Sequence, residues 1–222
     1  TGAGTRRERR GVVVASSHVN CAPETVTGLG YGASGTQGCV RVAATARARP
    51  VGHVVFSGGN EGAIAAFRDC DDDEYEISEE TVADAAACPV VSTTTPVREP
   101  IVESVGEQTH LNAMGADATG KEELAPELLR NAKIVIDDYE QCTHSGEINV
   151  PWEAGLLNDR DIHAELGDVV TGNADGRTAA DGVTVFDSTG LAIQDVAAAH
   201  VVYKHADSEG IGTRFPLVGT GT

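Results

Sequence analysis

The chain has 222 residues, of which 41% are hydrophobic and 4% aromatic, so it is long enough for one large domain with an aliphatic core. Its net charge of −18 excludes nucleic acid as a partner, because the phosphates would be repelled. Five cysteines without a CxxC pair argue against a zinc site or a disulfide framework, and no apolar run is long enough to span a bilayer.

The N-terminal residues and the ratio of acidic to basic residues indicate in which compartment the protein is found. The only lysines are Lys121, Lys133 and Lys204, and this excess of Asp and Glu over Lys is typical of halophilic proteins, with an ordinary acidic protein as the alternative. The N-terminus carries a basic cluster but no sustained apolar segment of a signal peptide and no initiator Met. We therefore expect a cytoplasmic protein whose chain begins inside a longer one.

Residues 1–24 are irregular in pattern and favour a flexible basic arm, whereas short apolar runs alternate with helical patterns from residue 25 onward. Strands are predicted over 25–29, 53–56, 75–77, 89–92, 108–114, 133–136 and 183–186, with 169–170 extended. Helices are predicted over 39–47, 61–68, 79–87 with Ser78 as its cap, 122–130, 161–165 and 191–207, and 137–144 is helical or irregular. This alternation predicts an α/β fold, a Rossmann-like doubly wound and mostly parallel sheet.

A glycine-rich segment follows the first predicted strand. The stretch from Gly30 to Gly35 satisfies GxGxxG between a strand and a helix, which favours a phosphate-binding turn over a plain turn. The second strand ends in Ser57 without a following acid or arginine, so Ser57 is a candidate contact to either a ribose hydroxyl or a phosphate. The sequence therefore predicts NAD or NADP as cofactor and leaves the choice open.

A second candidate segment follows the strand predicted over 108–114. This strand ends abruptly at Gly115-Ala116-Asp117, and a helical pattern begins at Lys121. Ligands of open α/β sheets bind at such carboxyl ends of strands, so the carboxylate of Asp117 is well placed for chemistry. The alternative is that Asp117 caps the helix, as Ser188 or Thr189 could cap the last helix.

Several segments together resemble the ornithine cyclodeaminase/mu-crystallin family, which includes the archaeal-type alanine dehydrogenases. The segments that carry the resemblance are Gly35-Thr36-Gln37, Val91–Pro100, His110–Asp117 with Gly120-Lys121, and Val185–Asp195. The resemblance runs from about Glu24 to about Thr213. It implies an NAD(P)-dependent oxidoreductase or cyclodeaminase that acts at the α-carbon of a small amino acid, of the alanine dehydrogenase or ornithine cyclodeaminase type.

The family plan joins a Rossmann domain to a substrate and dimerisation domain, which implies a homodimer. Residues 25–207 would form the NAD(P)-binding domain, 1–24 a remnant of the second domain or a disordered arm, and 208–222 a tail that returns to it. This chain has a shorter front than the family and reads Ala33-Ser34-Gly35 where the family has Gly-Ala-Gly. The alternatives are therefore a ketimine or pyrroline-carboxylate reductase, acting on a cyclic imine, and a truncated, non-catalytic dinucleotide-binding protein.

The resemblance also assigns roles to single residues. It implies that Asp117 is the catalytic acid/base and that Thr189 contacts the substrate. The cofactor contacts that it implies are Gly35, Thr36, Gln37, Thr95, Met114, Gly115, Ala116, Lys121 and Ser188. The seven histidines lack a ligand spacing such as HExxH, so no metal is expected, and His110 is predicted to be a core or dimer residue.

Overall fold

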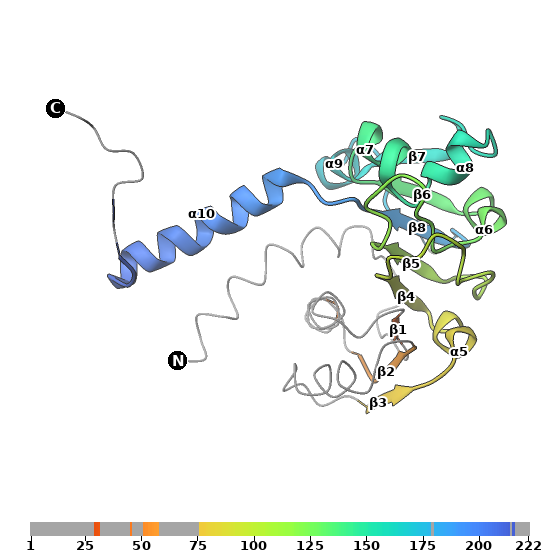
Figure 1. Ribbon diagram of the computed structural model, residues 1–222, viewed down its shortest axis with the longest axis horizontal. Helices are drawn as coiled ribbons and strands as arrows, with labels where there is room; N and C mark the ends of the chain where they lie inside the picture. Colours follow the sequence, from red (N-terminus) through yellow and green to blue (C-terminus); the bar gives the residue numbers. More distant parts are fainter. Residues whose placement is uncertain are drawn as a thin grey trace. The chain divides into compact units, whose positions relative to one another are not determined.

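The structure is a computed structural model that describes residues 29–31, 45, 51–57, 76–178, 180–213 and 215. Contacts divide the chain into two units, of which one is Val12–Gly190 and the other is Thr1–Gly11 with Leu191–Thr222. The larger unit contains the sheet, and the described part of the smaller unit contains the long helix α10 (Figure 1).

The described strands form one parallel sheet in the order β3-β2-β1-β4-β5-β8-β6-β7. The strands are β1 (Leu29–Tyr31), β2 (His53–Phe56), β3 (Glu76–Glu79), β4 (Val90–Thr93), β5 (His110–Ala113), β6 (Lys133–Ile136), β7 (Ile162–Glu165) and β8 (Thr184–Asp187). The winding reverses between β1 and β4, and such a switch point opens a crevice at the carboxyl ends of the strands. The predicted doubly wound α/β fold is thus confirmed.

Both faces of this sheet are covered. The helices are α5 (Val82–Ala86), α6 (Pro126–Arg130), α7 (Tyr139–Ser145), α8 (Asn149–Glu153) and α9 (Leu166–Thr171). Ile134 and Ile136 of β6 belong to the large buried cluster that contains residues of α5, α6 and α7, whereas Val135 between them packs with α9. Successive side chains of a strand point to opposite faces, so β6 is buried from both sides.

The predicted core role of His110 is confirmed. The side chain is fully buried in β5, and its Nδ1 lies 2.7 Å from Thr184 Oγ1 on the adjacent strand β8. This hydroxyl on the adjacent strand gives the buried Nδ1 a hydrogen-bond partner, as buried polar groups require.

Two helix starts differ from the prediction. Thr81, not Ser78, caps α5, because the Thr81 hydroxyl accepts from the Asp84 N–H while the Asp84 carboxylate accepts from the Thr81 N–H in a capping box. Ser78 lies in β3, where its hydroxyl is 2.9 Å from His53 Nε2. Helix α6 begins at Pro126 rather than at residue 122, since proline fits the first turn and Leu124 forms a β-bridge with Val102.

Three further predictions about local structure were wrong. Residues 162–165 form strand β7 rather than a helix, and Val169 and Val170 lie in helix α9 rather than in an extended segment. Gly30 and Tyr31 belong to β1, so the first strand ends later than expected. Most of residues 25–47, with Gly35, Thr36 and Gln37, and the helix predicted over 61–68 lie outside the described residues.

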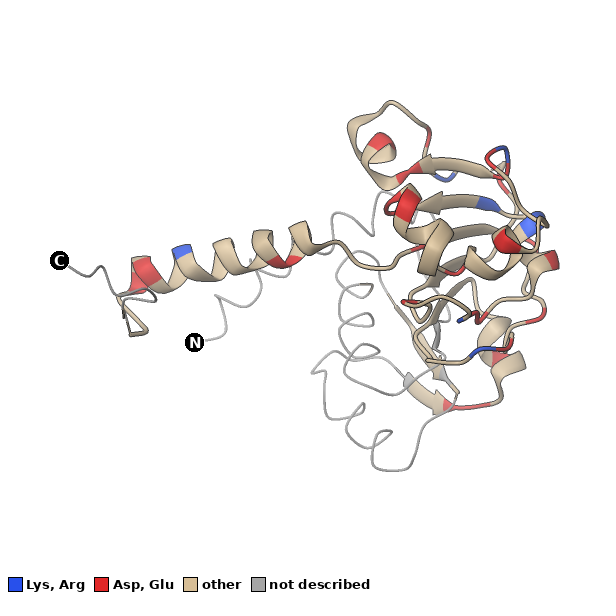
Figure 2. Ribbon diagram, turned by 45° about the horizontal axis from the view of Figure 1, so that its top comes forward, with Lys and Arg blue, Asp and Glu red and all other residues tan. Residues whose placement is uncertain are grey.

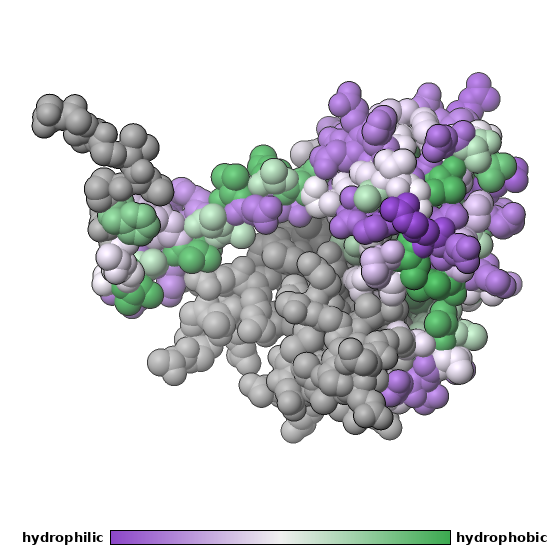
Figure 3. Space-filling view, in the orientation of Figure 1, coloured by the Kyte–Doolittle hydropathy of each residue, from purple (hydrophilic) through white to green (hydrophobic). Residues whose placement is uncertain are grey.

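The smaller unit contains α10 (Ala192–Glu209), which ends at Gly210 in the left-handed conformation, φ 66°. No residue of this helix is buried. Apolar side chains are exposed along it (Figure 3), among them Ile193 at 70%, Val196 at 67% and Tyr203 at 60%. None of the described helices is long and apolar enough to cross a bilayer.

Candidate active site

The predicted site residues of the described region gather at one edge of the sheet. Strands β4, β5 and β8 are neighbours and run parallel, so the segments that follow them leave the sheet together. The pairing continues past the strands, because the Met114 N–H donates to Thr93 O at 3.0 Å and the Ser188 N–H donates to Ala113 O at 3.1 Å. The residues brought to this edge are Thr95, Met114, Gly115, Ala116, Asp117, Lys121, Ser188 and Thr189.

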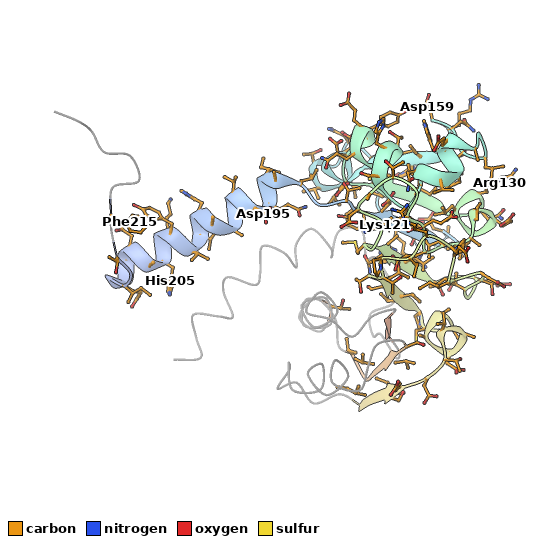
Figure 4. All side chains as sticks on the ribbon, in the orientation of Figure 1. Lys121, Arg130, Asp159, Asp195, His205 and Phe215 are labelled. Carbon is orange, nitrogen blue, oxygen red and sulfur yellow. The ribbon has the colours of Figure 1, made fainter. Side chains whose placement is uncertain are left out.

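Asp117 lies in the loop that leaves β5. Its side chain is 64% exposed and forms an ion pair with the Nζ of Lys121, whose side chain is 19% exposed. Lys121 is labelled in Figure 4. No helix begins at this loop, since α6 starts only at Pro126, so the alternative role of Asp117 as a helix cap is wrong. The carboxylate is therefore held by one cation and is otherwise open to a ligand.

The backbone of this loop is held by hydrogen bonds to residues at the end of α7 and at the start of α8. The Gly120 N–H donates to Asn149 Oδ1 at 2.8 Å, and Asn149 Nδ2 donates in return to Lys121 O at 2.8 Å. The Thr119 hydroxyl donates to His144 O at 2.9 Å. Gly120 has φ 76°, a conformation that glycine adopts without strain. The loop is thus positioned by long-range hydrogen bonds rather than by a helix.

The segment after β8 is held by Asp137, which follows β6. The Asp137 carboxylate accepts hydrogen bonds from the Ser188 hydroxyl at 2.8 Å, the Thr189 hydroxyl at 3.3 Å and the Gly190 N–H at 2.9 Å. The N-cap of α10 is Leu191 without a side-chain hydrogen bond, so neither Ser188 nor Thr189 caps this helix. No role was predicted for Asp137, although its position directly after a buried strand was a usable signal.

Three carboxylates near the strand ends are fully buried, and the first of them is Asp187 at the end of β8. The Asp187 carboxylate accepts from the Glu147 N–H at 2.9 Å and the Ile148 N–H at 3.2 Å. Burial raises the pKa of Asp187 from 3.8 to about 7, these two hydrogen bonds oppose the shift, and the charge of Asp137 adds to it. The turn between α7 and α8 packs directly against Asp187, because a Cβ added to Gly146 would lie 2.5 Å from Asp187 Oδ2.

Glu147, the second of these carboxylates, binds the backbone that precedes α6. Its Oε1 accepts from the Glu123 N–H at 2.7 Å and the Leu124 N–H at 2.6 Å, while its Oε2 is buried without a hydrogen-bond partner among the described residues. Burial raises the pKa of Glu147 well above its usual range. The hydrogen bond from the Leu124 N–H lowers this pKa, whereas the charges of Asp187 and Glu123 raise it further.

We expect Glu147→Gln to stabilise the protein at alkaline pH. Because the folded-state pKa of Glu147 is raised above 4.5, the wild-type carboxyl contributes less stability as pH rises through that value and above. The variant keeps the two hydrogen bonds through its amide oxygen and loses the buried charge. Its free energy of unfolding should match wild type near pH 4 and exceed it by about 1–3 kcal/mol at pH 8 to 9, because a buried carboxylate charge costs about 1.4 kcal/mol for each unit by which the pKa is raised.

Denaturant unfolding at a series of pH values tests this expectation, with Glu153→Gln as the matched control. Glu153 is exposed on α8, so the control makes the same change in charge without the change in burial. A Glu147→Gln curve parallel to that of Glu153→Gln at all pH values would contradict the expected effect.

Ser57 follows β2, at the edge of the sheet that carries the other predicted contacts. Together with Val91 and Thr93 it lines a small, mostly apolar hollow against α5 and Ile101. Directly after β4, the Thr94 hydroxyl is buried and has no hydrogen-bond partner among the described residues. Within that part of the chain, no three His, Cys, Asp or Glu side chains gather in an arrangement that could hold a metal ion.

Comparison with known proteins gives consistent relatives. The model of the ornithine cyclodeaminase/mu-crystallin family matches residues 9–210. The alanine dehydrogenase of Archaeoglobus fulgidus is 44% identical over 189 residues, which is 84% of this chain and 59% of that protein. The chain thus spans about three fifths of the length of this relative.

Solved structures give the same relationship. An archaeal alanine dehydrogenase dimer with bound NAD has a TM-score of 0.87 and 40% identity, covering 96% of this chain and 67% of the other. The Δ1-pyrroline-2-carboxylate reductase of Thermococcus litoralis, in complex with NADH and L-proline, has a TM-score of 0.84 and 26% identity, covering 94% and 66%.

Proposed function

Because this chain belongs to the ornithine cyclodeaminase/mu-crystallin family, we propose that it is part of an NAD(P)-dependent enzyme that acts at the α-carbon of a small amino acid. The observation that carries the proposal is the Asp117 carboxylate, exposed on a fixed loop at the carboxyl end of β5 and ion-paired with Lys121. An acid/base group in the crevice of a doubly wound sheet is suited to proton transfer beside a bound nucleotide.

The described residues at the strand ends fit a dinucleotide. The crevice opens between β1 and β4, and Thr94 lies directly after β4. Its hydroxyl has no hydrogen-bond partner among the described residues and can bond to a phosphate or a ribose. Ser57 lines the hollow at the end of β2. We assign Gly35, Thr36 and Gln37 to the pyrophosphate. Thr95, Met114, Gly115, Ala116, Lys121 and Ser188 are assigned to the remainder of the cofactor.

The nicotinamide, when bound, supplies the hydride acceptor for oxidation at the α-carbon or the hydride donor for reduction of an imine. Asp117 would take the proton that leaves the amino group and would stabilise the cationic iminium by its charge. Lys121 orients this carboxylate through the ion pair. The hydroxyl of Thr189, held by Asp137, would contact the substrate.

The alanine dehydrogenase relatives support oxidative deamination of a small amino acid as the reaction. A second candidate is reduction of a cyclic imine, which is supported by the likeness to the pyrroline-2-carboxylate reductase. Cyclodeamination of ornithine, a lyase reaction, uses the same proton transfers. These activities differ in the substrate contacts, and a chain that binds the nucleotide without turnover would be a dinucleotide-binding protein.

We also propose that the protein works as a homodimer in a salty cytoplasm. The exposed apolar side chains of α10 in the C-terminal unit support a contact surface there. Acidic residues are spread over the helices and loops of the larger unit, and basic ones are few (Figure 2), which supports function at high ionic strength. Residues 25–207 would form the nucleotide-binding domain, and 1–24 and 208–222 would belong to the substrate domain.

Fluorescence titration with NADH and with NADPH in molar KCl tests the proposal. We expect NADH to bind more tightly, because the residues directly after β2, Ser57 to Asn60, include no Arg or Lys to pair with a 2′-phosphate and the chain carries a net charge of −18. Turnover is then measured with L-alanine, L-ornithine and Δ1-pyrroline-2-carboxylate, and the active substrate names the reaction. Absence of binding to both nucleotides would overturn the proposed function.

A further inference from the structure

Glu123, the third buried carboxylate, joins the segments that follow β4 and β5. It is fully buried, and its Oε1 accepts from both the Thr95 N–H at 2.5 Å and the Thr95 hydroxyl at 2.6 Å. Its Oε2 accepts from the Gly115 N–H at 3.0 Å. One carboxylate thus uses one oxygen on each segment, and all of its donors come from the edge of the sheet where the site lies.

Gly115 packs directly against the Glu123 carboxylate. A Cβ on Gly115 would come within 3.0 Å of both the Glu123 carboxylate and the carbonyl oxygen of Thr95. Glycine therefore permits the two segments and the carboxylate to meet. The position of Gly115, two residues before Asp117, is set relative to Thr95 by this contact.

Glu123 is itself held by the other buried carboxylates. Its N–H donates to Glu147 Oε1, and the Glu147 N–H donates to Asp187 Oδ1 at the end of β8. The three carboxylates form a series in which each one binds the backbone that carries the next. The series connects the ends of three adjacent strands, β8, β5 and β4, through contacts that no exposed side chain supplies.

We propose that Glu123 is a positioning residue, which sets the separation between the nucleotide-binding segment at Thr95 and the catalytic loop at Asp117. This inference rests on the proposed function, in which Thr95 contacts the nucleotide and Asp117 transfers protons. Hydride transfer requires the substrate carbon, held near Asp117, to lie in register with the nicotinamide, and a displacement of about 1 Å at such a site lowers the rate by about 100-fold.

The structure supplies a matched pair of variants for testing this role. In Glu123→Gln the amide oxygen is favoured on the side of the two Thr95 donors, so the amide nitrogen faces the Gly115 N–H and this link is lost. In Glu147→Gln the amide oxygen keeps both N–H bonds, and the nitrogen takes the place of the unpaired Oε2. Both variants remove one buried acid, but only the first disconnects the two segments.

We expect Glu123→Gln to lower kcat per nucleotide-binding site by about 100-fold while the Kd for NADH changes less than about threefold. The concentration of nucleotide-binding sites is measured by NADH titration, so kcat refers only to folded protein. Glu147→Gln should keep wild-type values of both constants. A Glu123→Gln variant with wild-type kcat per site, or an equal loss of kcat in Glu147→Gln, would overturn the role.

Amide hydrogen exchange of the peptide that covers residues 114–121 gives a readout that does not depend on turnover. With saturating NADH, this peptide should exchange at least about tenfold faster in Glu123→Gln than in wild type or Glu147→Gln, because its Gly115 N–H loses an acceptor. If wild type binds NADH but turns over no substrate, the proposed function fails. In that case the positioning role is judged by this exchange alone, and equal rates refute it.

Should Glu123→Gln not fold, Thr95→Val tests the same link, because it removes the hydroxyl donor to Glu123 and keeps the backbone N–H. We expect Thr95→Val to lower kcat per site and Thr95→Ser to restore it. Equal kcat in Thr95→Val and wild type would overturn the proposal.

Discussion

Replacement of Asp117 by Asn is expected to lower turnover by about 10²–10⁴-fold, the usual contribution of a general acid or base. Asparagine has nearly the same shape but can neither accept a proton at neutral pH nor stabilise a developing iminium by charge. The change should appear in kcat, and the Kd for NADH should stay within about threefold, because the backbone of the loop is held by Gly120, Asn149 and Thr119 rather than by Asp117.

The fold should tolerate this substitution. The side chain of Asp117 is 64% exposed and its described partner is Lys121, and ion pairs at the surface contribute about 0–1 kcal/mol. Any large loss of activity therefore reports on chemistry rather than on unfolding.

Asp175→Asn is the matched control. Asp175 is exposed in the connection that leads into β8, which enters the sheet at the opposite edge, so the variant makes the same change in charge away from the site. Steady-state rates with the best substrate are compared for wild type and both variants. Turnover by Asp117→Asn within a factor of three of the Asp175→Asn rate would remove Asp117 from the mechanism.

The positions of the strand-end residues could be predicted from the sequence because they depend on local patterns. A short apolar run that stops at small or polar residues indicates a strand and its carboxyl end, and this pattern located Asp117, Thr95 and Ser188. Parallel strands all leave the sheet at one edge, so residues far apart in the chain meet once the fold class is known. The order of the strands in the sheet brings these three residues to neighbouring strands.

The buried carboxylates were not predictable in this way. Glu123 sits in a run that has a helical pattern, and its partners Thr95 and Glu147 are 28 and 24 residues away. Tertiary contacts override the local preference there, since a β-bridge at Leu124 keeps the chain extended until Pro126. Pro126 was the available signal, because proline commonly occupies the first turn of a helix.

The predictions for two short elements were wrong because tertiary contacts outweighed local preference there too. The segment 162–165 was expected to be helical, but it alternates apolar Ile162 and Ala164 with polar neighbours, as a half-buried edge strand does. Its pairing with β6 is irregular, and four residues carry too little periodicity to decide between the two structures. Val169 was misassigned because a β-branched residue has a strand preference, which its packing in α9 against Phe186 outweighs.

Gly115→Ala is expected to affect both stability and activity. The added Cβ would lie within 3.0 Å of the Glu123 carboxylate and of Thr95 O, and neither is the free end of a flexible side chain. The backbone after β5 must move, at a cost of about 1–3 kcal/mol in the free energy of unfolding, as for other overpacked sites. The same movement displaces Asp117, so turnover of the remaining folded protein should fall by about 100-fold.

Gly167→Ala separates this effect from the general consequence of replacing a glycine. Gly167 is exposed in α9, and a Cβ there would meet nothing within 4 Å. Alanine should stabilise that helix by about 0.5–1 kcal/mol, since glycine is the more flexible residue in the unfolded chain. Urea unfolding and kcat per NADH-binding site are measured for both variants. If Gly115→Ala behaves like Gly167→Ala in both assays, the β4 and β5 segments can separate without consequence, and neither Glu123 nor Gly115 sets the position of Asp117.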